Sequence, residues 1–189
     1  MPTYLPKISQ GITTVIVGNC GISAAATLQG EVPDPMNLLG EAEQFIYPTV
    51  NHYARAISDA RPEVNVGTLM GHTALRNNHM DDLFRPAREN EIAAMHGDLR
   101  EALRQGALGL STGLAYASAF SSTTEEVMAL AEELTDAGGL YTTHLRSEFA
   151  PILDAMDEAF RIGRHGLPVL YFPTINAPAR KTGDGRGKR

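Results

Sequence analysis

The sequence has little of several features, and each scarcity excludes a class of protein. Its 189 residues include a single cysteine, so no internal disulfide can form. No apolar run approaches the length of a bilayer span, and residues 1–7 lack the charged-then-apolar layout of a secretory signal. The formal net charge of -6 argues against nucleic acid or an anionic membrane as the main partner. We therefore expect a cytoplasmic protein that binds neither.

What is present is typical of a globular domain, with 43% hydrophobic and 20% charged residues. The β-branched run Ile12–Val17 predicts a strand that is buried on both faces. This strand stops at a turn that carries the only cysteine, Cys20, between Gly18 and Gly21. Such loops carry the chemistry of α/β enzymes, although a lone cysteine in a turn is more often a small buried hydrophobe than a ligand.

Predicted strands and helices alternate along the rest of the chain. Further strands are expected over 64–70, 107–111, 140–143 and 167–171. Helices are expected over 48–59, over 89–105, from a capping box of Thr123 and Glu126 to Gly138-Gly139, and along the apolar stripe Ile152, Met156 and Phe160. Residues 24–47 are expected to form a long functional loop. The alternation indicates an α/β fold with a parallel sheet and right-handed crossovers.

Four polar residues follow the carboxyl ends of these strands: Cys20, His72, Tyr116 and His144. In a (β/α)8 barrel all such ends open on one face, whereas a doubly wound sheet gathers only those near its switch point. A barrel therefore fits better, but five strands are too few to close one. We expect a partial TIM-like (β/α)8 barrel of about five parallel strands that alternate with helices.

Cys20 and His144 are the best metal-ligand candidates, because a thiolate and an imidazole both suit zinc. Catalytic zinc usually has three protein ligands, and His72 either supplies a third or only bonds to the backbone. Tyr116 either polarises a substrate carbonyl or is an ordinary aromatic residue at the rim. Three charged residues of the same loops could bind a carboxylate, although surface ion pairs are the commoner fate: Arg76, Arg146 and Glu148.

Several sequence blocks, in order along the chain, resemble the N-acyl-D-amino-acid deacylases (D-aminoacylases) of the amidohydrolase superfamily. They are residues 9–14 (SQGITT), 17–23 (VGNCGIS), 71–76 (GHTALR), 106–116 (GALGLSTGLAY) and 143–148 (THLRSE). The resemblance implies a TIM-like barrel beside a small β-domain and zinc-dependent hydrolysis of the amide bond of an N-acyl-D-amino acid. It also implies that Cys20 and His144 bind the zinc and that Tyr116 bonds the scissile carbonyl oxygen.

The sequence also departs from that family. The family's His-x-His pair before the cysteine and its catalytic aspartate after the eighth strand have no counterparts here, so we expect these 189 residues alone to be inactive. After the strand at 167–171 the family tends to read Ser-His-His-Lys, whereas this sequence continues Phe-Pro-Thr-Ile-Asn over 172–176.

A shift of reading frame would explain this last departure. Residues 172–185 can be back-translated into DNA, with synonymous codons chosen to fit. Translation of that DNA from the third base of each original codon then gives Ser-His-His-Lys-Cys-Ala-Gly-Pro-Glu-Asn-Trp-Gly. Most bases of that string are determined by the amino acids. We expect residues 1–169 to form the partial amidohydrolase barrel and residues 170–189 to be an irregular, basic, frame-shifted tail.

Two alternatives remain open on the sequence. A non-catalytic interaction module derived from a barrel would use the basic segment 181–189 to bind a protein partner. An amidohydrolase of the cyclic-amide type would carry a carboxylated lysine where this sequence has Cys20, but no lysine occupies an equivalent strand end.

Overall fold

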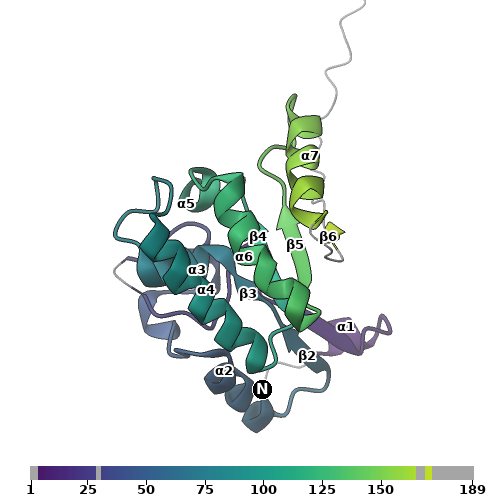
Figure 1. Cartoon of the computed structure of the whole chain (residues 1–189). Coiled ribbons are helices and arrows are strands. Elements are labelled where there is room, and N and C mark those ends of the chain that lie inside the picture. Colours follow the sequence, from purple (N-terminus) through teal and green to yellow (C-terminus); the bar gives the residue numbers. More distant parts are fainter. Residues whose placement is uncertain (1–3, 29–30, 165–168, 172–189) are drawn as a thin grey trace, which may run out of the picture.

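The computed structural model describes residues 4–28, 31–164 and 169–171 and shows the expected α/β alternation (Figure 1). The strands are β1 Thr14–Val17, β2 Asn65–Thr68, β3 Met70–Gly71, β4 Gly109–Gly113, β5 Leu140–His144 and β6 Val169–Tyr171. The α-helices are α1 Leu5–Ile8, α2 Val50–Ala60, α3 His72–His79, α4 Glu89–Arg104, α5 Ala117–Phe120, α6 Thr124–Ala137 and α7 Ile152–Gly163. Two short 3-10 helices, η1 Met36–Leu39 and η2 Ala42–Gln44, lie in the expected long loop.

All strand pairs are parallel, in the orders β1-β2 and β3-β4-β5-β6. Only Leu69 separates β2 from β3, so the single strand predicted over 64–70 divides between two neighbours. Its first half pairs with β1, and its second half pairs with β4. This succession of parallel strands and helices confirms the predicted partial barrel.

The prediction that the first strand is buried on both faces is wrong. In β1 exposed and half-buried residues alternate, and Ile16 retains 44% of its accessible surface. Among the described residues β1 pairs with β2 alone, so its other edge has no strand partner there. The β-branched run therefore predicted the strand correctly but not its burial.

The main core lies between the sheet and the two long helices α4 and α6, which run side by side (Figure 1). Met95 and Leu99 of α4 are fully buried, as their helical spacing predicts, and so is Leu130 of α6. Tyr141 of β5 is also fully buried, and its hydroxyl bonds with Thr112 Oγ1 of β4 at 2.9 Å.

Two helices differ from the sequence prediction. α3 starts at His72, directly after β3, where a strand-end loop was expected; Gly71 in extended backbone is its N-cap. In α7 the predicted stripe is rotated, because Ala155, Ala159 and Ile162 are buried whereas Phe160 is 53% exposed. Two alanines and Ile162 are therefore the buried positions of this helix, and the Phe160 ring lies outside.

The predicted capping box at α6 is half formed. Thr123 Oγ1 accepts the Glu126 backbone N–H at 3.0 Å, and the helix ends as expected at Gly138, whose φ is 64°. The Glu126 side chain turns inward instead of back to the cap, and it bonds with His72 and Arg76 of α3. No helix in the described part of the chain is long and apolar enough to cross a membrane.

Candidate functional site

The three predicted site residues Cys20, Tyr116 and His144 meet at the carboxyl ends of the strands. The β4–β5 register places Gly113 opposite His144, so Tyr116, three residues later, reaches the imidazole. The Tyr116 hydroxyl lies 3.4 Å from His144 Nδ1, and the two rings meet edge to face with centroids 5.2 Å apart. Cys20 hydrogen-bonds with the same hydroxyl. One phenol therefore joins the thiol to the imidazole.

Cys20 reaches this position through an unusual turn. Its own φ is 57°, and Gly18 and Gly21 on either side have φ values of 86° and 78°. Two hydrogen bonds then hold the turn against α3 and β4: Thr73 N–H donates to Gly21 O at 2.8 Å, and Gly21 N–H donates to Ser111 Oγ at 3.1 Å. The glycine spacing seen in the sequence is thus required by the left-handed backbone.

Gly113 allows the close approach of this turn to β4. A Cβ atom at Gly113 would lie 2.2 Å from Cys20 O and 2.7 Å from the Tyr116 ring. Glycine is therefore needed at this position so that Cys20 and Tyr116 can both pack against the end of β4.

We expect Gly113→Ala to separate Cys20 from Tyr116 and to lower the free energy of unfolding by about 1–3 kcal/mol, because it forces extra volume into a packed site. Gly97→Ala is the matched control. Gly97 lies within α4 with nothing within 4 Å of a Cβ, so alanine there should stabilise by about 0.5–1 kcal/mol. Urea unfolding of both variants measures this difference, and equal effects would contradict the steric role of Gly113.

The electrostatics of the site favour the protonated forms of its acidic groups. Burial raises the pKa of the Cys20 thiol, and the hydrogen bond with Tyr116 offsets this only in part. Burial likewise raises the pKa of Tyr116, and the neighbouring Cys20 raises it further. Both groups therefore keep their protons until a cation or another positive group enters the site.

The donor chemistry of this site fits zinc, since a thiol and an imidazole neighbour the same hydroxyl. Within the described residues, however, no group of three His, Cys, Asp or Glu side chains is placed to hold a metal ion. Cys20 and His144 could therefore supply two ligands, and a further ligand would have to come from outside this group.

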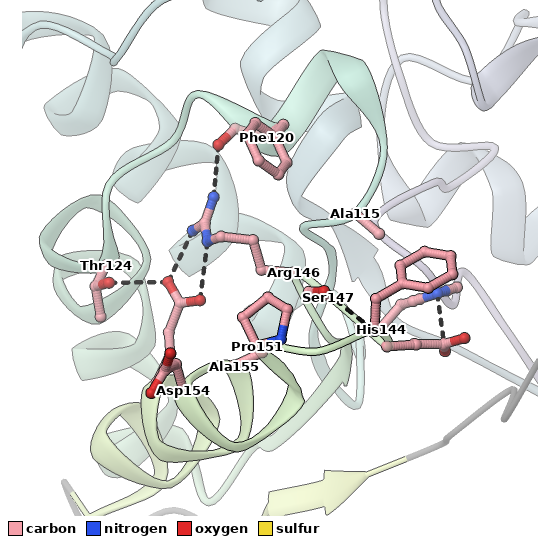
Figure 2. Close-up of a pocket in the computed structure, with 12 residues that line it drawn as sticks. Ala115, Phe120, Thr124, His144, Arg146, Ser147, Pro151, Asp154 and Ala155 are labelled. Atoms are coloured by element: carbon pink, nitrogen blue, oxygen red, sulfur yellow. Dashed lines mark hydrogen bonds and ion pairs between the residues drawn. The ribbon is translucent and has the colours of Figure 1, made fainter. Parts of the chain in front are cut away.

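His144 and Glu148 line a cavity of about 780 Å³ that residues of α5, α6 and α7 also line. Figure 2 shows His144 across this cavity from Thr124 and Asp154. His144 Nε2 lies 3.3 Å from Glu148 Oε1. His144 is the last residue of β5, not the first one after the strand, so its backbone is fixed by the sheet. The cavity offers room for a small molecule beside the imidazole.

His72 is not part of this cluster. It is fully buried, and its Nε2 lies 2.9 Å from Glu126 Oε1. Arg76 is also fully buried and donates to the same oxygen at 2.5 Å, so the expected surface ion pair is wrong for this residue. The structure thus favours the non-ligand alternative for His72. Arg146 binds Glu158 through two bonds, of 2.9 and 2.7 Å, which compensates its charge within the protein.

Sequence reasoning missed Ser111 and gave Glu148 a different role from the one that the structure shows. Ser111 of β4 accepts from Gly21 and donates to the backbone oxygen of Gly18, which ties the Cys20 turn to the sheet. Glu148 contacts His144 directly, whereas the sequence offered it only as a carboxylate binder or a surface pair. The four-residue spacing of His144 and Glu148 was visible, but only a helix or a defined loop turns such spacing into a contact.

Parallel strands that present a thiol, an imidazole and a phenol at their carboxyl ends are an arrangement expected of a barrel enzyme. The chain matches the model of the Amidohydrolase family over residues 1–177, and it belongs to that family. It is 47% identical over 164 residues to the N-acyl-D-aspartate deacylase of Alcaligenes xylosoxydans xylosoxydans, and this match covers 86% of this chain and 33% of that protein. It is 43% identical over 166 residues to the D-aminoacylase of the same organism, a match that covers 87% of this chain and 34% of that protein.

Solved structures agree with these relatives. A crystal structure of D-aminoacylase superposes with a TM-score of 0.84 at 43% identity, covering 88% of this chain and 35% of that one. The N-acyl-D-glutamate deacylase of Bordetella bronchiseptica, complexed with zinc and a phosphonate inhibitor, superposes with a TM-score of 0.82 at 40% identity. This match covers 87% of this chain and 35% of that one. The predicted family and fold are confirmed, and the chain spans about a third of the length of these relatives.

Proposed function

We propose that this chain contributes the Cys20, Tyr116 and His144 part of a site for zinc-dependent hydrolysis of the amide bond of N-acyl-D-amino acids. The observation that carries the proposal is the contact of one phenol with both a thiol and an imidazole at the carboxyl ends of parallel strands. The names of the relatives support the substrate class, since they act on N-acyl-D-aspartate and N-acyl-D-glutamate. A site that needs a reduced thiol also favours a cytoplasmic location.

In this proposal Cys20 and His144 hold zinc through sulfur and nitrogen. Bound zinc lowers the pKa of a water molecule towards about 7 and polarises a carbonyl. The Tyr116 hydroxyl keeps its proton, because burial and the nearby Cys20 raise its pKa, and it donates that proton in a hydrogen bond to the carbonyl oxygen of the substrate. The adjoining cavity receives the rest of the substrate beside His144.

A chimaera tests the proposal. The matching third of the Alcaligenes N-acyl-D-aspartate deacylase is replaced by this chain's residues, so that the relative supplies the rest of the barrel. We expect zinc-dependent hydrolysis of N-acetyl-D-aspartate, N-acetyl-D-glutamate or N-acetyl-D-leucine, and none by the 189-residue chain alone. Tyr116→Phe in the chimaera should lower kcat by about 100-fold or more with a smaller change in KM.

The controls of the chimaera are the unaltered relative and a His144→Ala chimaera. All three proteins are assayed at the zinc concentration that saturates the unaltered relative. A folded chimaera that binds zinc but hydrolyses none of the three substrates would overturn the proposed activity. Hydrolysis that persists in the His144→Ala chimaera would show that the site of this chain is not used.

Residues 172–189 lie outside the described part of the chain, and their frame shift remains a proposal. Its support is the match of the alternative reading of 172–185 to the family's Ser-His-His-Lys block. Sequencing the encoding DNA from the codon for Gly166 decides it. An alternative frame that reads Ser-His-His-Lys and stays open supports the shift, whereas one that closes at once makes the tail 170–189 genuine.

A further inference from the structure

His144 has a different partner on each ring nitrogen. Its Nδ1 lies 3.4 Å from the Tyr116 hydroxyl, the group that also neighbours Cys20. Its Nε2 lies 3.3 Å from Glu148 Oε1, and both residues line the cavity. Both side chains of the His144–Glu148 pair are only 14% exposed, so solvent competes weakly with their contact.

The chemistry of these two partners distinguishes the nitrogens. A neutral imidazole has one N–H donor and one acceptor nitrogen, and an ionised carboxylate can only accept. The 3.3 Å ion-pair contact with Glu148 therefore favours the form of His144 in which Nε2 carries the proton. That leaves the lone pair of Nδ1 directed towards the Tyr116 hydroxyl, which also neighbours Cys20. A histidine that binds a metal generally needs such a partner on its other nitrogen.

The loop that carries Glu148 is held at a second point. Arg146, two residues before Glu148, forms two hydrogen bonds with the carboxylate of Glu158 in α7. It also donates to Phe120 O of α5 at 2.5 Å (Figure 2). Thr124 Oγ1 of α6 donates to the same Glu158 carboxylate at 2.8 Å. Three helices thus anchor the chain just after β5, so the position of Glu148 does not depend on the His144 contact alone.

We propose that Glu148 is a positioning residue that holds His144 with Nε2 protonated and Nδ1 unprotonated, so that Nδ1 can bind a cation together with Cys20. This inference rests on the proposed function as far as the cation is concerned. The proton position on His144, in contrast, can be measured without any metal. The alternative geometry places a cation between His144 Nε2 and Glu148, and it requires the proton on Nδ1.

The first measurement is the ¹⁵N chemical shifts of the His144 ring in the metal-free 189-residue chain, assigned with the variant His144→Gln. We expect the Nε2–H form to dominate the neutral imidazole, and Glu148→Gln to remove this preference because an amide can donate as well as accept. The matched control Asp154→Asn removes a carboxylate that lines the same cavity from α7, away from His144, and should leave the shifts unchanged (Figure 2). A dominant Nδ1–H form in the unmodified chain would overturn the proposal.

The second measurement is the zinc dissociation constant of the same proteins, determined by competition with a chromophoric chelator. Glu148→Gln should weaken zinc binding by about 10–100-fold, and Asp154→Asn by far less. Unchanged affinity in Glu148→Gln would contradict the positioning role. Absence of zinc binding by the unmodified chain, together with a dominant Nε2–H form, would contradict the proposed metal site while supporting the role of Glu148.

Discussion

Replacement of Cys20 by alanine is expected to weaken zinc binding by more than about 100-fold in the chimaera and to remove its hydrolytic activity. The reason is that Cys20 would be a direct ligand, and even outer partners of metal ligands are worth about 10–100-fold. Its thiol is held beside the Tyr116 hydroxyl, in a turn whose left-handed backbone is fixed on both sides by glycine. Zinc content after dialysis and the rate of N-acetyl-D-aspartate hydrolysis measure the two effects.

The opposing interpretation, in which Cys20 is a small buried hydrophobe, predicts that Cys20→Ala destabilises the fold. If Cys20 is a ligand instead, its replacement by alanine should change the free energy of unfolding of the metal-free chain by less than about 1 kcal/mol, because Cys20 is only partly buried. Gly113→Ala, which displaces the same turn, serves as the control that does destabilise. A large loss of stability without a loss of zinc affinity in Cys20→Ala would favour the hydrophobic interpretation.

The strands could be located because short stretches with apolar, β-branched or aromatic residues stop at glycine or at a polar residue, although β4 and β5 themselves contain serine and threonine. Tyr116 and His144 could be placed on one face because carboxyl ends of parallel strands share an edge. Their actual contact depends on the register of Gly113 opposite His144, which no local pattern contains. The site was therefore predictable as a neighbourhood but not as a set of distances.

Residues that act through distant partners escaped prediction for the same reason. Ser111 bonds to Gly21 across 90 residues of sequence, and Glu126 bonds to His72 across 54. The local pattern assigned Glu126 to a helix cap, which is the correct expectation for an isolated helix start. Burial against α3 changed the outcome, since a charged group in the core requires charged or polar partners there.

Replacement of Glu126 by glutamine is expected to lower the free energy of unfolding by about 3–5 kcal/mol, because it leaves the buried Arg76 guanidinium without a counter-charge. Both side chains are at most 1% exposed, and within the described residues Arg76 Nε and His72 Nδ1 already have no hydrogen-bond partner. Glu133→Gln on the same helix is the matched control. Glu133 pairs with the exposed Arg100, so its loss should be about 0.2–1 kcal/mol. Urea unfolding near pH 7 compares the two variants. Similar losses of unfolding free energy would show that the buried cluster of Glu126, Arg76 and His72 stabilises the fold no more than a surface ion pair does.

The same cluster predicts how stability depends on pH. Burial alone would raise the pKa of Glu126, but the bonds from His72 and Arg76 outweigh it and lower the pKa to about 2. The carboxylate therefore stabilises the fold above its unfolded pKa of about 4.5, and this contribution is lost as the pH falls towards 2. Burial lowers the pKa of His72, so below about pH 6.5 the unfolded chain takes up a proton that the folded chain does not, which also weakens the fold.

The unmodified chain should thus lose stability from about pH 6.5 downward, whereas Glu126→Gln should lose less between pH 4.5 and 2, because it has no carboxylate to protonate there. Urea unfolding of both proteins across this range tests the sign, and parallel curves below pH 4.5 would show that Glu126 is not the group responsible.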